Sequence, residues 1–222
     1  MQYLYHKDAK VSSLSLIGDT HRYIFKVRRH KEGAILYLRN LQDDILYSYQ
    51  IASLTKKEAL LELQTQKKYP VNAKRELHIG WCIVDPKSIE RVLPTLNELG
   101  VAQITFIYCQ RSQKSFQVDF KRWEKIILNS SQQSGRSTPM RLNTSPTLKE
   151  FLECNPSAYL LNFSDNNLST KEQIKTIVIG CEGGLTVEEI ELFQTEAIVG
   201  LDTPLILKSE SAVTAVASKI LL

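Results

Sequence analysis

The chain has 222 residues, of which 43% are hydrophobic and 23% charged, and its formal net charge is +4 at neutral pH. These values are ordinary for a globular protein with one large domain or two smaller ones. No apolar run reaches the length of a membrane span, and the first residues, MQYLYHKDAK, lack the basic leader and apolar core of a secretory signal. We therefore expect a cytoplasmic protein that does not cross a membrane.

The cysteines give no sign of a metal site. Cys82, Cys109, Cys154 and Cys181 are widely spaced and form no C-x-x-C pair, and three of them fall in apolar runs. Buried free thiols in a reducing cytosol account for them better than disulfides do. We therefore predict free cysteines and no bound metal.

Charge is distributed unevenly along the chain. Residues 1–72 carry 12 Lys and Arg against 7 Asp and Glu, and residues 73–145 carry 11 against 6. Residues 146–222 reverse the balance, with 5 basic and 11 acidic side chains. A basic front suggests that the first two thirds of the chain contact a polyanion. The alternative is the drift of surface charge that any chain shows.

The first 70 residues are typical of a small β domain. Residues 33–40, 45–54 and 58–66 are rich in Leu, Ile and Tyr, and short polar clusters separate them. This spacing predicts a small β-barrel or sandwich. Residues 67–72, KKYPVN, break the pattern and predict a linker, so that the first domain spans residues 1–72.

From residue 76 the pattern alternates between strands and helices, which predicts a largely parallel sheet covered on both faces. Asp85 and Pro86 predict the start of a helix and Gly100 its end. Thr186 and Glu189 form a capping box for a later helix. Trp81 and Trp123 fall in apolar patterns and are predicted core residues. The strands are expected at 77–84, 104–109, 158–163, 176–180 and 197–201, and the helices at 86–99, 118–133 and 148–154, within a second domain of residues 73–222.

Two stretches near the end of the chain each run from an apolar strand through a loop into a helix. They are TIVIGCEGGLTVEE (176–189) and GLDTPLILKSESAVTAVA (200–217), and three glycines crowd the first loop. Glycine allows other atoms close to the backbone, and open α/β sheets bind ligands at loops after parallel strands. The loop matches neither G-x-G-x-x-G nor the G-K-[ST] phosphate-binding pattern, so neither a dinucleotide nor a nucleoside triphosphate is indicated. A small-molecule site is one interpretation, and a tight turn without a ligand is the other.

These two stretches resemble the IGPEGG and LGxRILRxETA signatures of the ribosomal RNA small subunit methyltransferase E family, a group of SPOUT-class enzymes. Further matches follow in order over nearly the whole chain. Residues 98–101 are similar to the family's ELGV, and Arg111-Ser112 matches its RS pair. The remaining matches are Trp123–Ile126, Gln133–Arg136 and Pro139, similar to W-x-K-I and EQSxR-x-x-P, and His21, Val27-Arg28 and Gly33 in the first domain.

The resemblance implies a two-domain enzyme. Residues 1–72 would form a PUA-like RNA-binding β-barrel, and residues 73–222 a SPOUT-type α/β domain whose parallel sheet ends in a C-terminal trefoil knot. The family methylates N3 of a uridine in 16S ribosomal RNA with S-adenosylmethionine, and SPOUT enzymes are typically homodimers with the site near the subunit interface. We therefore expect 16S ribosomal RNA or the small ribosomal subunit, and a second copy of the chain, as partners. The alternatives are a SPOUT enzyme acting on another RNA position and an RNA-binding protein without turnover.

The resemblance also implies which residues hold S-adenosylmethionine. Three loops of the knot would surround it. Glu182 could favour the sulfonium or bind a ligand hydroxyl, or it could cap the amides of its own loop. The predicted contacts are Leu161, Asn162, Phe163, Ile179, Gly180, Glu182, Gly183, Gly200, Leu201, Leu205, Ile206 and Leu207.

Several positions depart from the family pattern. Cys181 replaces a proline that would stiffen the loop, and Lys208 replaces an arginine whose bidentate fork it cannot reproduce. Ser209 and Ser211 replace threonines. Thr95 stands near the place of a family lysine, and the family's N-terminal arginine is absent from MQYLYH. The fold prediction does not depend on these positions.

Two residues are candidates for the chemistry. N3 of uracil must lose its proton before or during methyl transfer, so the site needs a general base or a cation that stabilises the uridinate. Arg136 is the candidate cation, although it could instead pair with a helix carbonyl or an RNA phosphate. Glu210 is the candidate carboxylate, although the helix dipole alone would favour it in the first turn of the last helix. Ser209 is expected to cap that helix.

A basic cluster around Tyr23 and Phe25 is the candidate RNA-binding site. Cations neutralise phosphates, and aromatic rings stack on bases. A solvated helix face over a local core is the alternative. The predicted RNA contacts are His21, Lys26, Arg28 and Arg29, with Arg111 in the second domain.

Overall fold

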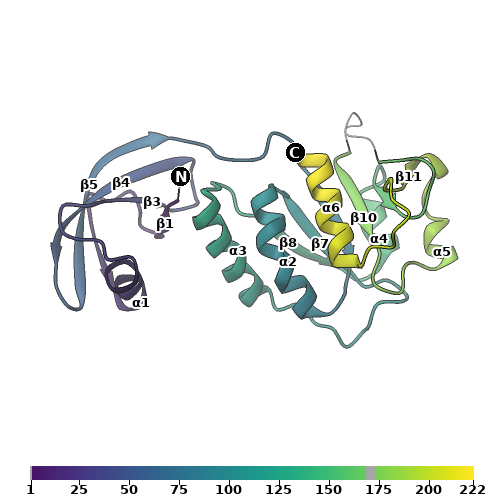
Figure 1. The fold of residues 1–222 in the computed structure, drawn as a ribbon, viewed down its shortest axis with the longest axis horizontal. Coiled ribbons are helices and arrows are strands. Elements are labelled where there is room, and N and C mark those ends of the chain that lie inside the picture. The colour runs from purple at the N-terminus through teal and green to yellow at the C-terminus, as the bar shows by residue number, and fades with distance from the viewer. Residues whose placement is uncertain (1, 169–173) are drawn as a thin grey trace. The chain divides into compact units, whose positions relative to one another are not determined.

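The computed structural model describes residues 2–168 and 174–222 (Figure 1). The chain divides into two units. The first comprises Met1–Asn72 and Ser131–Thr138, and the second comprises Ala73–Ser130 and Pro139–Leu222. The first unit therefore includes a segment, Ser131–Thr138, that the sequence pattern assigned to the second domain.

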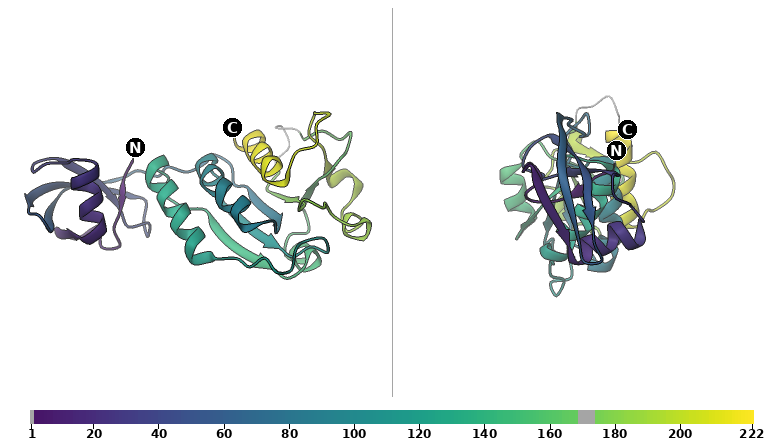
Figure 2. Two further views of the ribbon diagram at one scale, coloured as in Figure 1. Left: turned by 60° about the horizontal axis from the view of Figure 1, so that its bottom comes forward. Right: turned by 90° about the vertical axis from the view of Figure 1, so that its left-hand side faces the viewer.

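The first unit is built on a curled sheet of five strands in the order β1-β3-β4-β5-β2 (Figure 2). Alternation turns its apolar residues inward, as in β2, where Leu14 and Leu16 are buried between exposed neighbours. The pairing of β4 with β5 shifts register at two places, and such bulges bend long strands. The elements are β1 Leu4–Tyr5, β2 Ser13–Ile17, α1 Gly18–His21, the π-helical η1 Arg22–Val27, β3 Ile35–Arg39, β4 Ile45–Leu54 and β5 Glu58–Lys68.

The second unit is built on six parallel strands in the order β11-β9-β10-β6-β7-β8. All the strands predicted for this part of the chain are present. The strands are β6 His78–Cys82, β7 Gln103–Ile107, β8 Arg141–Ser145, β9 Tyr159–Leu161, β10 Thr176–Ile179 and β11 Ile198–Val199. The helices are α2 Pro86–Leu99, α3 Phe120–Ser134, α4 Leu148–Cys154, α5 Val187–Ile190, the short 3-10 turn η2 Thr195–Ala197, and α6 Ser209–Leu221.

Helices cover both faces of this sheet, as predicted. Trp81 and Phe106 lie on one face, where the ring of Trp123 in α3 packs against Phe106 with centroids 4.8 Å apart. Gly80 points to the other face, because a side chain there would overlap the ring of Phe151 in α4. Helices α2, α3 and α6 lie side by side along the first of these faces (Figures 1 and 2). Trp81 and Trp123 are fully buried, so both are core residues as predicted.

The prediction of free cysteines is wrong for one pair. Cys82 and Cys109 form a disulfide with 5.8 Å between their Cα atoms. Cys82 ends β6, and Cys109 lies two residues beyond the end of β7, so parallel pairing of these strands brings residues 27 apart in sequence within bonding range. Cys154 and Cys181 are free, and Cys154 is exposed rather than buried.

Among the residues that the structure describes, no helix is both long and apolar enough to cross a membrane. Over the same residues, no group of three or more His, Cys, Asp or Glu side chains lies in an arrangement that could hold a metal ion.

Candidate functional site

A cavity of about 850 Å³ opens in the second unit at the carboxyl ends of β9, β10 and β11. Three loops line it, each following one of these strands. All twelve residues predicted to hold a cofactor belong to its lining: Leu161, Asn162, Phe163, Ile179, Gly180, Glu182, Gly183, Gly200, Leu201, Leu205, Ile206 and Leu207. The topology therefore gathers into one cavity residues that are up to 46 positions apart in the sequence.

The glycine loop forms one wall of the cavity as a tight turn. The Gly184 N–H donates to the Cys181 carbonyl at 2.9 Å, and Gly184 adopts a φ of +69°, which only glycine reaches without strain. The Cys181 thiol donates to the Gly184 carbonyl at 3.4 Å. The turn is thus closed by a backbone bond and a thiol bond at the position where the sequence lacks proline.

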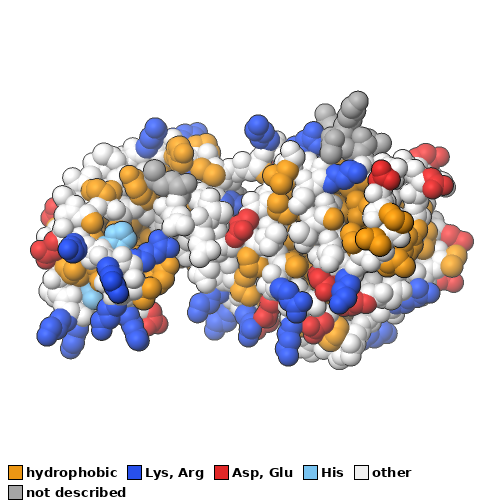
Figure 3. All heavy atoms as spheres, viewed as in Figure 1, with side chains coloured by type: hydrophobic (Ala, Val, Ile, Leu, Met, Phe, Trp, Pro, Cys, Tyr) orange, Lys and Arg blue, Asp and Glu red, His pale blue; other side chains and the backbone are white. Residues whose placement is uncertain are grey.

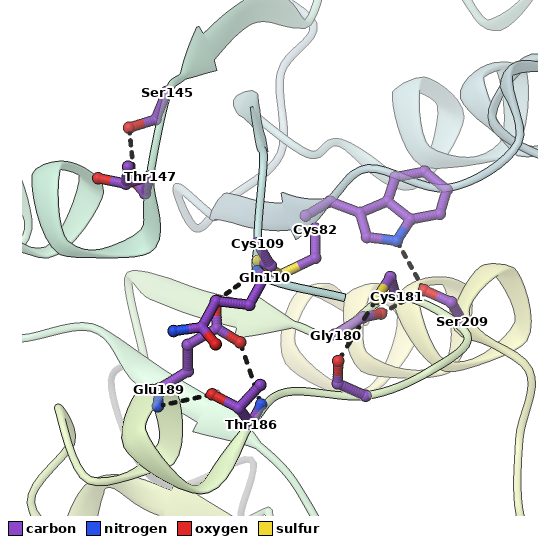
Figure 4. Close-up of a disulfide and its surroundings, with 12 residues drawn as sticks. Cys82, Cys109, Gln110, Ser145, Thr147, Gly180, Cys181, Thr186, Glu189 and Ser209 are labelled. Atoms are coloured by element: carbon purple, nitrogen blue, oxygen red, sulfur yellow. Dashed lines mark hydrogen bonds between the residues drawn. A yellow bond between two sulfur atoms is a disulfide. The ribbon is translucent and has the colours of Figure 1, made fainter. Parts of the chain in front are cut away.

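The start of α6 is fixed to this wall by Ser209. Its hydroxyl donates to the Gly180 carbonyl at 2.5 Å and accepts from the indole N–H of Trp81 at 2.8 Å (Figure 4). The prediction that Ser209 caps α6 is wrong, because Lys208 occupies the N-cap position and Ser209 is the first helical residue. The hydroxyl instead satisfies the buried indole N–H of Trp81 and the half-buried carbonyl of Gly180.

A second wall forms where two chain segments cross closely. Gly200 donates its N–H to the Asn166 carbonyl at 2.8 Å, and its own carbonyl accepts from Leu168 at 2.7 Å. A Cβ atom at Gly200 would overlap the carbonyl oxygen of Ser164. Glycine is therefore required here by close backbone approach rather than by an unusual φ.

The loop after β7 braces the glycine loop from the other side. Arg111 donates through Nη1 to the Gly183 carbonyl at 2.8 Å. The Gln110 N–H donates at 2.8 Å to Oε1 of Glu189, whose Oε2 accepts from the Thr186 N–H at 3.0 Å (Figure 4). The capping box of Thr186 and Glu189 is therefore present as predicted. Arg111, predicted to contact RNA, lies in the lining of the cavity and contacts the glycine loop.

The rim of the cavity combines apolar and acidic groups. Phe163, Leu205 and Ile206 are 80%, 70% and 82% exposed. Glu182, Asp165 and Asp202 are also exposed and line the cavity. Such a cavity suits a small molecule that has a flat apolar part together with hydroxyl or cationic groups. Asp165 and Asp202 were missed by sequence reasoning, because no spacing distinguishes them from ordinary loop acids.

The two candidate catalytic residues are not in the lining of this cavity. Glu210 is half-buried in the first turn of α6, as predicted from the sequence. Arg136 belongs to the first unit, where its Nε donates to the Thr138 carbonyl at 2.6 Å and its own carbonyl accepts from the Tyr3 hydroxyl. Burial lowers the pKa of Arg136 to about 10 and raises the pKa of Tyr3 to about 12. Their catalytic roles stay predictions.

The basic cluster of the first unit is exposed except for His21. His21 is 5% exposed, its Nε2 lies 3.1 Å from the Thr55 carbonyl, and its ring packs against Phe25. Arg28 donates to the Tyr23 hydroxyl at 3.0 Å and stacks over that ring. Lys26 and Arg29 are exposed. Three of the four predicted contacts are therefore accessible to RNA, and His21 supports the local core.

Family models of RNA methyltransferases match most of the chain. One, described as an RNA methyltransferase domain, matches residues 71–221, and another, described as an RNA methyltransferase PUA domain, matches residues 16–64. The chain therefore belongs to the RNA methyltransferases that carry a PUA domain. It is 36% identical to ribosomal RNA small subunit methyltransferase E of Helicobacter pylori over 98% of each chain, and 22% identical to the protein of that name from Aquifex aeolicus over 97% of each. Within the class, the chain is a member of the ribosomal RNA small subunit methyltransferase E family.

Solved structures share the fold. Ribosomal RNA small subunit methyltransferase E from Neisseria gonorrhoeae, bound to S-adenosyl methionine, matches with a TM-score of 0.81 at 18% identity, over 98% of this chain and 95% of that one. A putative methyltransferase from Legionella pneumophila, in complex with the same cofactor, matches with a TM-score of 0.79 at 22% identity, over 97% of this chain and 94% of that one. The predicted α/β sheet with an N-terminal PUA-like unit is confirmed. The trefoil knot stays a prediction.

Proposed function

We propose that the chain transfers a methyl group from S-adenosylmethionine to N3 of a uridine in 16S ribosomal RNA of the small subunit. One observation carries the proposal: both stretches that resemble the family signatures contribute to the lining of a single cavity. Full-length similarity to ribosomal RNA small subunit methyltransferase E supports the substrate class. The position on the RNA rests on the resemblance.

The residues of the cavity fit S-adenosylmethionine. Leu205, Ile206 and Leu207 would provide an apolar surface for the adenine ring, and Gly200 lies in the same lining. Carboxylates such as Glu182 and Asp202 suit ribose hydroxyls and the positive sulfonium. When bound, S-adenosylmethionine supplies an electrophilic methyl group on sulfur.

The protein must then position the uridine, remove the N3 proton and exclude water. We assign to Arg136 the stabilisation of the uridinate, because a guanidinium with a pKa of about 10 remains charged at neutral pH. Glu210 is the candidate to accept the proton from N3. As neither lines the cavity of its own chain, we expect the functional unit to be a homodimer in which the exposed rim at Phe163, Leu205 and Ile206 is covered.

RNA recognition is assigned to the first unit. Lys26, Arg28 and Arg29 are exposed cations beside the exposed ring of Tyr23. Phosphate neutralisation by the cations and stacking on the ring are the two contributions that such a surface offers. The substrate is 16S ribosomal RNA, free or in the small subunit.

The proposed function is tested in a strain that lacks the gene. Small-subunit RNA from this strain is incubated with the purified protein and S-adenosylmethionine carrying a deuterated methyl group, and its nucleosides are analysed by mass spectrometry. We expect one labelled 3-methyluridine per RNA, at a position that is unmethylated in the deletion strain. Label in a different nucleoside would make the chain a methyltransferase of another RNA position. Absence of label, with the cofactor bound, would make it an RNA-binding protein without turnover.

A further inference from the structure

Five exposed cations gather around the N-terminal ends of α2 and α3. Lys87 and Arg91 come from α2, Lys121 and Lys125 from α3, and Lys114 from the loop before α3; we call them the α2–α3 basic surface. Figure 3 shows Lys and Arg side chains along the edge of the second unit where these helices begin. In the described part of the chain, none of the five takes part in an ion pair.

The two helices are joined at this surface. Arg122 of α3 pairs with Glu90 of α2 at 2.7 Å, and the indole N–H of Trp123 donates to the same carboxylate at 3.3 Å. Lys87 and Lys125 each lie three residues from a member of this ion pair, which places them on neighbouring positions of their helices. Glu90 is thus paired with Arg122 and not with Lys87.

Helix stability does not account for Lys87 and Lys121. The N-terminus of a helix carries a partial positive charge, so acids are favoured in the first turn and cations are disfavoured. Helices α4, α5 and α6 of the same unit follow this rule, with acids in each first turn. Neither α2 nor α3 has an acid there, and Lys87 and Lys121 occupy the second helical position of each. Their capping aspartates, Asp85 and Asp119, are engaged by backbone N–H groups.

The surface also lies on the same edge of the sheet as the cavity. Helices α2 and α3 begin after the carboxyl ends of β6 and β7, and the cavity lies at the carboxyl ends of β9, β10 and β11. Because β10 pairs with β6, the two halves of this edge are adjacent. One half is basic, and the other carries the cavity acids Asp165, Glu182 and Asp202. The basic half attracts phosphates, and the cavity beside it has two cations in its lining, Arg111 and Lys208, together with these acids.

We infer that the α2–α3 basic surface binds the phosphate backbone of the substrate RNA and leads the target nucleotide to the cavity. This inference rests on the proposed function. It adds a contact surface on the methyltransferase unit itself to the one expected on the PUA-like unit. The contacts are to phosphates, so they position the RNA without reading its sequence.

The test is the salt dependence of RNA binding by the full chain. We compare Lys87→Gln/Lys121→Gln with the matched control Lys74→Gln/Lys175→Gln, which removes two exposed lysines before β6 and β10 at the opposite edge of the sheet. Binding of small-subunit ribosomal RNA is measured from low to physiological salt. Loss of two phosphate contacts reduces the slope of log K against log salt by roughly 1.4 to 1.8, and the control leaves it unchanged.

Two further readouts separate the possible results. The Lys87→Gln/Lys121→Gln variant is expected to bind S-adenosylmethionine as the wild type does and to be no less stable, because each cation opposes a helix dipole. Equal slopes in the variant and the control, with wild-type protein that methylates RNA, would overturn this inference and leave the proposed function intact. If the wild-type protein does not bind the RNA, the inference about the α2–α3 basic surface and the proposed function are both wrong.

Discussion

Ser209 is the residue that connects the most elements at the cavity. Its hydroxyl joins the β6 indole of Trp81 to the Gly180 carbonyl after β10. Ser209→Ala leaves that buried donor and acceptor without their partner, which we expect to lower the free energy of unfolding by about 1–3 kcal/mol. Urea denaturation measures the loss.

Ser211→Ala is the matched control for this substitution, because Ser211 is exposed on the same helix. Its effect should lie within about 0.5 kcal/mol of zero. Equal losses in the two variants would show that the Ser209 hydroxyl contributes nothing specific.

The glycines of the cavity are not equivalent. A Cβ at Gly200 would overlap the Ser164 carbonyl, whereas a Cβ at Gly183 would meet the Arg111 side chain at 3.5 Å, an ordinary contact. We therefore expect Gly200→Ala to push apart two walls of the cavity and reduce cofactor affinity at least tenfold, and Gly183→Ala to retain most of it. Calorimetric titration of both variants measures the difference. Similar affinities would mean that the crossing at Gly200 does not shape the binding site.

The protonation of His78 is expected to make the folding stability depend on pH. Burial lowers the pKa of its imidazole below the ordinary value of 6.5, and Nε2 lies 2.8 Å from the Thr105 hydroxyl. The unfolded chain therefore binds a proton at this residue more readily than the folded chain, so stability is lost as pH falls through 6.5 and below. The loss between pH 7.5 and 5.5 should be smaller in His78→Gln, as measured by urea denaturation. An identical loss in both proteins would assign the pH dependence to other groups.

The disulfide gives a chemical test of the pairing between β6 and β7. Protein purified without reductant and denatured in iodoacetamide should take up two alkyl groups, at Cys154 and Cys181, because Cys82 and Cys109 are bonded. Prior reduction should raise the number to four. In the native protein, Cys154 should react first because Cys181 is buried. Four alkyl groups without reduction would show that the two strand ends carry free thiols.

Periodicity and capping predicted the strong elements of the fold. Helix α2 is capped by Asp85 at its start and by Gly100 at its end, where a φ of +101° requires glycine. Strand β8 was missed because its sequence, RLNTS, is polar and only Ser145 is buried, as an edge strand allows.

Contacts between distant residues could not be predicted from local pattern. The glycine density around Gly183 indicated a binding loop, and the cavity agrees with it. The brace from Arg111 to Gly183, the role of Ser209 and the Cys82–Cys109 bond depend on which strands are neighbours. Strand order is a property of the whole sheet, and the residues at these positions do not indicate it.

The uneven distribution of charge along the sequence has a counterpart in the structure. The acidic last third of the chain supplies the cavity carboxylates Asp165, Glu182 and Asp202, whereas basic side chains come from the first unit and from α2 and α3. Acidic side chains attract a cationic cofactor, and basic side chains attract the phosphates of an RNA backbone. The proposed RNA-binding surfaces and the carboxylates of the cofactor cavity are thus opposite in charge.

We propose that the cavity between the glycine turn and the Gly200 crossing is where S-adenosylmethionine binds. Isothermal titration calorimetry of the full-length protein with this cofactor tests it most directly. We predict one molecule bound per chain in the wild type, with affinity retained in Gly183→Ala and reduced at least tenfold in Gly200→Ala. Absence of binding by the folded wild-type protein would show that this cavity is not a site for S-adenosylmethionine.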